Sequence, residues 1–229
     1  MNYLSRVSID PASVDAARLA KDVCINAYRE HQHLWRLFDV DPDAERDFLF
    51  RREQPTDGFP RFYLLSRREP RHGDNVWQIE TKDYRPAIHA GQQLAFSLRV
   101  NPVITRRDAK GRQVRHDVVM DLKHRMGFQK LPVSERPLLG DLIQQAGLEW
   151  LQTRAERYGF SLSPGKVRVE GYQQHRASKK GGKNPIRYST LDFTGLLSVV
   201  EAELFKQTLI NGIGPAKAFG CGLLLVRRL

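Results

Sequence analysis

The segment AELFKQTLINGIGPAKAFGCGLLLVR, residues 202–227, decides how we interpret the rest of the chain. Residues 202–209 have the apolar spacing of a helix, and residues 223–227 form an apolar run typical of a strand. Four glycines lie between them, within residues 212–222. A dinucleotide-binding fingerprint has the opposite order, because its glycines follow a strand and open a helix. The segment therefore predicts a different kind of glycine-rich loop.

Two interpretations of this loop remain open from spacing alone. Glycine allows positive φ and close approach of a ligand, and successive exposed N–H groups bind anions, to which Lys217 would add a charge. A Walker phosphate loop is excluded because Lys217 lies in mid-loop and not directly after the last glycine. A long turn into a terminal strand explains the same glycines. The candidate anion-binding glycines are Gly212, Gly214, Gly220 and Gly222.

The upstream pattern places this segment at the end of a β-α-β-β-α-β unit, which is the ferredoxin-like signature. The expected elements are a strand over residues 94–100, one or two helices over residues 138–158 interrupted near Gly147, strands over residues 167–174 and 189–199, the helix over residues 202–209 and the closing strand. Residues 104–132 are the least legible stretch and are interpreted as an inserted hairpin rich in arginine.

The first half repeats the opening of this order. A strand is expected over residues 3–9, and Asp10-Pro11 reads as the start of a helix of up to about seven turns that runs towards Phe38. Three short strands follow, over residues 48–50, 62–65 and 76–79, without a clear second helix. We therefore predict an α+β protein of two domains, residues 1–88 and 92–229, joined by a connector.

Bulk composition describes an ordinary globular protein. The 229 residues are 41% hydrophobic and 28% charged, and no apolar run approaches the roughly 20 residues of a membrane span. The first residues lack the apolar region of a signal peptide, so the expected location is the cytoplasm. Cys24 and Cys221 are far apart and form no CxxC spacing, which favours core thiols over a zinc site or a disulfide.

The formal net charge of +11 predicts a polyanionic partner if the basic residues cluster. One cluster lies between Val167 and Tyr188, a stretch whose single acidic residue is Glu170. Its basic residues are Arg168, Arg176, Lys179, Lys180, Lys183 and Arg187. A second contains Arg106, Arg107, Lys110, Arg112 and Arg115. Solvated surface loops are the alternative explanation, but basic strands beside a basic tip favour phosphate contacts. No RNP motif is present, so recognition of RNA by shape and backbone is expected.

The candidate chemical group is a histidine late in the first helix. At helical spacing Tyr28 and His31 lie on one face, whereas His33 is rotated by roughly 200° from His31. An imidazole beside a phenol suits general acid–base chemistry, although spacing alone favours a packing histidine. The sequence has no GxSxG, no HExxH and no close set of aspartates for two metals, so we expect no metal and no cofactor.

Four motifs together resemble the CasE family, the CRISPR-associated endoribonucleases that process repeat RNA in type I-E systems. They are YREHQHLW (residues 28–35), RDFLFRRE (residues 46–53), LRVNP (residues 98–102) and GIGPAKAFGCGLL (residues 212–224). The resemblance covers nearly the whole chain. It implies two tandem ferredoxin-like (RRM-like) domains whose antiparallel sheets face a central cleft that binds RNA.

The resemblance also implies a reaction and its residues. Precursor CRISPR RNA would be cut at the base of the repeat hairpin, and the product would stay bound within the Cascade complex. The family's catalytic histidine and tyrosine match His31 and Tyr28, its glycine-rich loop matches residues 212–222, and its stem-gripping element matches the basic hairpin over residues 176–187.

We expect attack by the RNA 2′-hydroxyl, a 2′,3′-cyclic phosphate and a 5′-hydroxyl as products, and a supporting role for Lys217. The main alternative is a non-catalytic RNA-binding subunit, and a nucleotide-binding enzyme that uses the glycine loop is weaker still.

Overall fold

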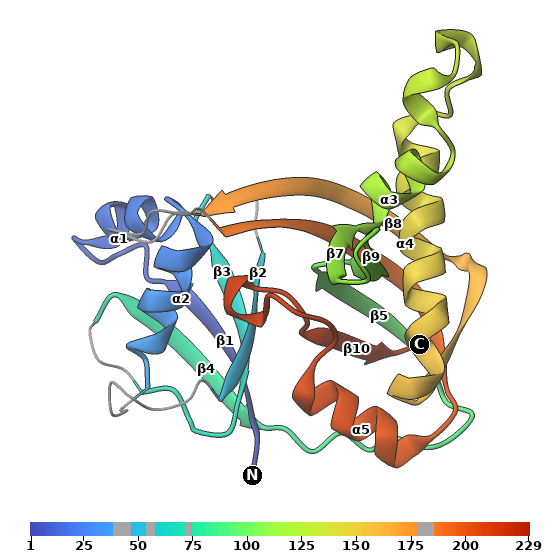
Figure 1. Cartoon of the computed structure of the whole chain (residues 1–229). Coiled ribbons are helices and arrows are strands. Elements are labelled where there is room, and N and C mark those ends of the chain that lie inside the picture. Colours follow the sequence, from blue (N-terminus) through green and yellow to red (C-terminus); the bar gives the residue numbers. More distant parts are fainter. Residues whose placement is uncertain (39–46, 54–57, 72–74, 178–185) are drawn as a thin grey trace. The chain divides into compact units, whose positions relative to one another are not determined.

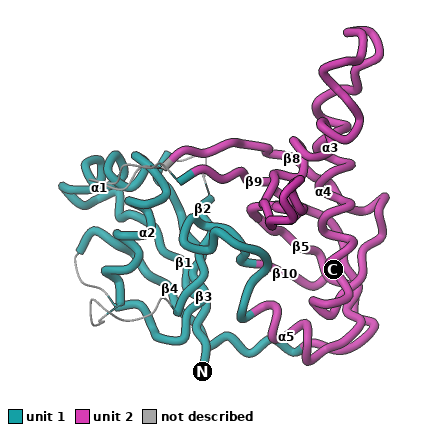
Figure 2. Tube along the Cα trace, in the orientation of Figure 1, with its two compact units in different colours: residues 1–87, 177–186, 210–223 teal, residues 88–176, 187–209, 224–229 magenta. Residues whose placement is uncertain are grey.

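The computed structural model describes residues 1–38, 47–53, 58–71, 75–177 and 186–229. The chain divides into two compact units, drawn in different colours in Figure 2. Unit 1 comprises residues 1–87, 177–186 and 210–223, and unit 2 comprises residues 88–176, 187–209 and 224–229. The glycine-rich loop thus belongs to the same compact unit as the first helices, although residues of unit 2 flank it in the sequence.

Unit 1 contains a four-stranded antiparallel sheet with the order β2-β3-β1-β4. Its strands are β1 (Tyr3–Ile9), β2 (Phe48–Glu53), β3 (Arg61–Ser66) and β4 (Trp77–Asp83). The predicted strand over residues 3–9 is confirmed to the residue. The three later strands are also confirmed: β2 and β3 extend beyond the predicted bounds, and β4 begins one residue later than predicted and runs further. This strand order is that of a ferredoxin-like sheet in which a helical crossover joins the first two strands.

Two short helices, not one long one, make this crossover. Helix α1 (Ala16–Val23) and helix α2 (Ala27–Trp35) are separated at Asn26, whose backbone is extended and whose Oδ1 accepts hydrogen bonds from Tyr28 N and Arg29 N. Asn26 is therefore an N-cap that starts a new helix. The prediction of a continuous helix was wrong. Asp10 accepts from Ala12 N in a turn that precedes α1 and does not cap the helix.

The helices cover one face of the sheet. The core between them includes Leu34 of α2, Phe50 of β2 and Phe62 of β3, which are fully buried. Val7 of β1 lies opposite both Phe62 and Ile79 in the sheet register. Because Leu34 anchors α2 in this core, the helix is fixed against the edge strand β2 and its neighbours.

Unit 2 contains the second four-stranded sheet of the described residues, with the order β10-β5-β9-β8 (Figure 1). Its strands are β5 (Gln93–Val100), β8 (Phe160–Ala177), β9 (Ile186–Val199) and β10 (Leu224–Arg228). With α4 (Leu139–Ala155) after β5 and α5 (Ala202–Asn211) after β9, the predicted β-α-β-β-α-β order is confirmed. The α+β class with antiparallel sheets is therefore correct in both units.

Helix α4 runs without interruption through Gly147. A Cβ at Gly147 would lie 2.4 Å from Val169 Cγ1 and 3.1 Å from Leu191 Cδ1. Gly147 thus permits close packing of the helix on the sheet. The predicted interruption was wrong because this glycine serves a tertiary contact and not a helix end.

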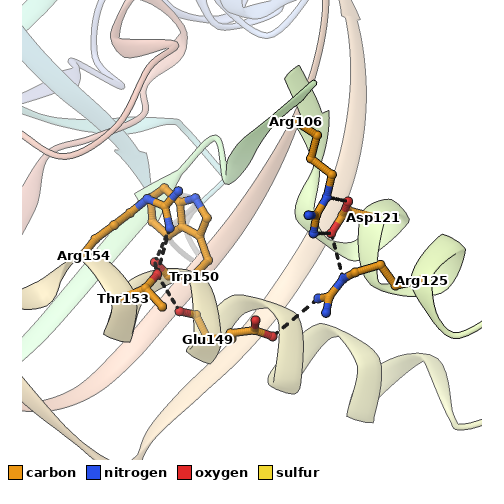
Figure 3. Close-up of polar contacts among 7 residues, drawn as sticks. All are labelled: Arg106, Asp121, Arg125, Glu149, Trp150, Thr153 and Arg154. Atoms are coloured by element: carbon orange, nitrogen blue, oxygen red, sulfur yellow. Dashed lines mark hydrogen bonds and ion pairs between the residues drawn. The ribbon is translucent and has the colours of Figure 1, made fainter. Parts of the chain in front are cut away.

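An insertion between β5 and α4 forms the predicted hairpin, β6 (Val103–Arg107) paired with β7 (Gln113–Asp117), and then the unpredicted helix α3 (Val118–Arg125). Figure 3 shows how it is fastened: Arg106 forms a two-pronged ion pair with Asp121 of α3, and Arg125 links Asp121 to Glu149 of α4. Arg106 lowers the pKa of Asp121. Two arginines of the second basic cluster are thus in ion pairs, since Arg112 pairs with Asp108.

Four single-turn 3₁₀ helices complete the described elements: η1 (Phe128–Lys130), η2 (Val133–Glu135), η3 (Glu156–Tyr158) and η4 (Lys217–Phe219). Across the described residues, no helix combines the length and the apolar character needed to cross a membrane.

Candidate active site

The candidate site of unit 1 lies where helix α2 contacts turn η4 of the glycine-rich loop. Turn η4 also contacts strand β2. Helix α2 carries Tyr28 and His31, and η4 begins at Lys217. The three predicted catalytic residues therefore come from two elements that touch, although about 190 residues separate them in the sequence.

His31 is half-buried among aromatic rings. Its imidazole stacks on Phe48 with a centroid distance of 5.6 Å and an interplanar angle of 15°. Trp35 and Phe50 lie at 5.7 and 6.4 Å from the same ring. The ring stack restricts the imidazole to a small range of orientations, which is what a proton-transferring group requires. Sequence spacing did not reveal these rings, although the alternation Phe48-x-Phe50 places both on one face of a strand.

His33 lies on another face of α2 and has a structural role. Its Nε2 lies 2.6 Å from Asp22 Oδ2, which ties α2 to α1. This hydrogen bond is the main reason why the pKa of Asp22 is lowered, with a smaller contribution from the charge of Arg29. A hollow of about 730 Å³ adjoins His33 and Asp22 between α1, α2 and the start of β4, and His31 does not line it. The two histidines of this helix thus have different surroundings.

Tyr28 is half-buried in the first turn of α2, one helical turn before His31. Its backbone N–H donates to the Asn26 cap at 3.0 Å, so the same hydrogen bonds that start the helix also set the position of Tyr28. The spacing i, i+3 keeps the phenol on the face that carries the imidazole.

Lys217 forms a hydrogen bond that stabilises the end of helix α5. Its Nζ donates to the backbone oxygen of Asn211, the last residue of α5, at 2.7 Å. A cation at this end of a helix also stabilises its dipole. Lys217 lines a hollow of about 300 Å³ together with Asn211 and Phe48, the ring that stacks on His31. A role for Lys217 at the phosphate stays a prediction.

The glycine-rich loop packs around the edge strand β2. A Cβ at Gly220 would lie 3.2 Å from Phe50 Cε2, and one at Gly212 would lie 2.7 Å from Leu49 Cδ1. Phe50 and Leu49 point to opposite faces of the strand, so the loop contacts both faces. The loop also closes on itself, because Ile213 N donates to Gly222 O at 2.9 Å. These contacts require glycine for packing, and the binding of phosphate by this loop stays a prediction.

The glycines of the loop meet a conformational requirement as well. Gly212, Gly214, Gly220 and Gly222 have φ of 72°, 78°, 75° and 95°. A side chain at Gly222 would be strained at this φ, and its Cβ would lie 2.9 Å from Ile213 O. The four glycines thus adopt the positive φ that the sequence analysis said they allow.

The basic residues predicted to bind RNA are distributed unevenly in unit 2. Arg176 of β8 and Arg187 of β9 are exposed and line a groove of about 620 Å³, to which β7 contributes Arg115. Arg168 is exposed and pairs with Glu170 on the same strand at 2.8 Å. Lys179, Lys180 and Lys183 lie outside the described residues. The groove therefore joins one member of the second basic cluster to two of the first.

An aromatic pair in this groove was not predicted. His175 stacks on Tyr188 with a centroid distance of 4.7 Å and an interplanar angle of 17°. His175 also makes a 2.9 Å hydrogen bond with Thr190, and burial, followed by the charge of Arg99, lowers its pKa. The two residues belong to the consecutive strands β8 and β9, and their stacking depends on the register of these strands, which the sequence pattern did not give.

Comparison with known proteins identifies the family. A family model described as "CRISPR associated protein" matches residues 2–228. The chain belongs to this CRISPR-associated family. The predicted resemblance is confirmed, because the CRISPR system Cascade subunit CasE of Escherichia coli strain K12 is 31% identical over 224 residues, which cover 97% of each chain.

Two further similarities support the family assignment. The CRISPR-associated endoribonuclease Cse3 of Thermus thermophilus is 27% identical over 238 residues, covering 98% of this chain and 99% of the relative. A solved structure of Thermus thermophilus Cse3, bound to an RNA representing a pre-cleavage complex, has a TM-score of 0.70 and covers 99% of this chain and 98% of that chain. The fold predicted for this CRISPR-associated protein is thus found in a structure with RNA.

Proposed function

We propose that this CRISPR-associated protein is an endoribonuclease that cuts precursor CRISPR RNA and works as a subunit of a Cascade complex. One observation carries the proposal: helix α2, which bears His31 and Tyr28, contacts the glycine-rich loop. The relatives support it: one is named a Cascade subunit and another a CRISPR-associated endoribonuclease that was solved with RNA.

The proposed reaction uses the RNA as its own nucleophile. The 2′-hydroxyl attacks the adjacent phosphorus, the bond to the 5′ oxygen breaks, and a 2′,3′-cyclic phosphate and a 5′-hydroxyl result. His31 moves a proton, either from the 2′-hydroxyl or to the departing 5′ oxygen, and Tyr28 orients the 2′-hydroxyl or the imidazole. Lys217 and the glycine-rich loop offset the charge on the phosphate. The protein needs no metal ion and no cofactor in this scheme.

The basic strands of unit 2 are proposed to hold the repeat hairpin so that its base is cut and the product stays bound. The residues are Arg168, Arg176, Lys179, Lys180, Lys183 and Arg187, and Arg115 is added because it shares the groove of Arg176 and Arg187. Positive charge favours a polyanionic backbone without reading its sequence. We also propose that residues 1–88 and 92–229 are the two domains and that the protein works in the cytoplasm.

Two reactions test the mechanism. Cleavage of a repeat RNA in excess EDTA should proceed at the full rate, and a strict requirement for Mg²⁺ would contradict the scheme. A substrate with a 2′-deoxy nucleotide before the scissile bond should bind nearly as well as the all-ribose RNA but remain uncut, and the cleaved all-ribose RNA should carry a 2′,3′-cyclic phosphate.

A second candidate is a non-catalytic subunit that binds structured RNA. The groove of Arg115, Arg176 and Arg187 favours it, since these residues could hold RNA without any contribution from His31. Failure of the purified protein to cut repeat RNA that it binds tightly, under all buffer conditions, would support this candidate over the endoribonuclease.

A further inference from the structure

A buried carboxylate lies next to His31 in the chain. The side chain of Glu30 is only 8% exposed and forms an ion pair with Arg52 of β2, whose side chain is 30% exposed. A carboxylate this buried is costly unless it is paired and hydrogen-bonded. Removing the guanidinium would therefore leave an uncompensated charge on the residue that precedes His31 in the chain.

One face of β2 holds both residues of α2. Phe48, Phe50 and Arg52 alternate along the strand and so point to the same side. The rings of Phe48 and Phe50 pack against His31, and the guanidinium of Arg52 contacts Glu30. Consecutive residues of the helix are thus held by alternate residues on the helix-covered face of one strand.

The contacts of α2 differ in how strongly they restrict the rotation of this helix on the sheet. A helix of nine residues is marginal by itself, so its setting depends on tertiary contacts. Packing of rings and aliphatic side chains is non-directional and tolerates small rotations. A charge-assisted hydrogen bond from a guanidinium to a carboxylate is directional, and Arg52 makes this bond from a fixed strand.

We infer that Glu30 and Arg52 are a positioning pair: their ion pair sets the rotation of α2 on β2 and thereby aims the His31 imidazole at the scissile phosphate. The inference rests on the proposed function, because it requires His31 to act on RNA. A misplacement of a catalytic group by about 1 Å can cost on the order of 10²-fold in rate, so a positioning pair is visible in the cleavage step.

The two charges of the pair are opposite, so replacing one of them changes the net charge on the elements that hold His31. Without Arg52, the remaining carboxylate favours the imidazolium, and the midpoint of the pH–rate profile moves to higher pH. Without Glu30, the remaining guanidinium moves it to lower pH. The other titratable or charged side chains on the elements that pack against His31 are unchanged in both variants: Tyr28, Arg29, His33, Arg51, Glu53 and Lys217.

The experiment compares Arg52→Met, Glu30→Met and the double variant in single-turnover cleavage of repeat RNA at saturating enzyme, with RNA affinity and thermal melting measured in parallel. Each single variant should cleave about 10-fold or more slowly with affinity changed less than about twofold. The double variant should recover to within about threefold, because no unpaired charge remains and two methionine side chains fill the space. Glu203→Gln, which breaks an exposed ion pair with Lys206 on α5, is the matched control and should cleave normally.

The outcomes are distinguishable. Normal cleavage by both single variants, or slower cleavage without opposite shifts of the pH midpoint, would overturn the positioning role. If either methionine variant fails to fold, Arg52→Gln and Glu30→Gln replace it in the same assay, with the same expected direction, because both remove the charge and keep a polar side chain. A His31→Ala variant that still cleaves would instead contradict the proposed function, independently of Glu30 and Arg52.

Discussion

The α2–η4 site of unit 1 and the basic groove of unit 2 differ in how they use charge. At the site, the acidic group next to His31 is buried and neutralised, and the imidazole is held by aromatic rings. In the groove, Arg115, Arg176 and Arg187 are exposed around a hollow of about 620 Å³. A neutralised, packed site suits precise placement of a reacting group, whereas exposed guanidinium groups suit attraction of a phosphate backbone. Changes at the site should therefore lower the rate of RNA cleavage, whereas changes in the groove should lower the affinity for RNA.

The largest expected effect tests the site. His31→Ala should lower the single-turnover cleavage rate by about 10²–10⁴-fold, the usual worth of a positioned acid or base, while the affinity for repeat RNA stays nearly unchanged. Gel-based cleavage and a binding assay on the same preparation measure both quantities. Loss of affinity in parallel with rate would contradict the separation.

The groove should show the reverse pattern. Replacing Arg115, Arg176 and Arg187 together by glutamine should weaken RNA binding and reduce the log–log salt slope of affinity by about 2–3, since each phosphate contact contributes roughly 0.7–0.9. Cleavage at saturating enzyme should remain near the normal rate. Arg112→Gln is the control, because Arg112 already pairs with Asp108. An unchanged salt slope would remove the groove from the RNA interface.

A smaller effect concerns the stability of unit 1 in acid. The pKa of Asp22 is lowered in the folded protein, so its bond with His33 stabilises the fold above the ordinary value of 3.8 and loses this contribution as the pH falls through the lowered value. Thermal melts of the normal protein and Asp22→Asn should therefore differ at pH 6. The difference should shrink as the pH falls below about 4 and vanish once the pH is below the lowered pKa of Asp22. A difference that persists in acid would show that the Asp22 charge is not the cause.

Local patterns predicted much of the fold because its strands are regular. β1 was placed to the residue, and the helix–loop–strand order of the C-terminal segment fixed the ferredoxin-like topology of unit 2. The break between α1 and α2 was missed because Asn26 caps a helix inside an uninterrupted apolar stripe. At Gly147 the opposite error occurred: a helix break was predicted, but this glycine packs against Val169 inside a continuous helix.

The site was predictable only where a motif carried it. Local patterns singled out Tyr28, His31 and the glycine-rich loop as candidates, but spacing alone favoured a packing role for His31 and left the loop undecided. Their catalytic and phosphate-binding roles were implied by the family resemblance. The ring stack on Phe48 and the ion pair between Glu30 and Arg52 depend on tertiary packing between α2 and β2. The hydrogen bond of Lys217 with Asn211 likewise could not be predicted from the sequence pattern.

The path of the polypeptide has a consequence for synthesis. Residues 210–223 return to unit 1 after nearly all of unit 2 has been made. A ribosome that has translated the helix with His31 must add almost the whole remaining chain before Phe50 and Leu49 receive the loop that packs on them. Unit 1 therefore cannot complete its packing around β2 until translation reaches this last segment.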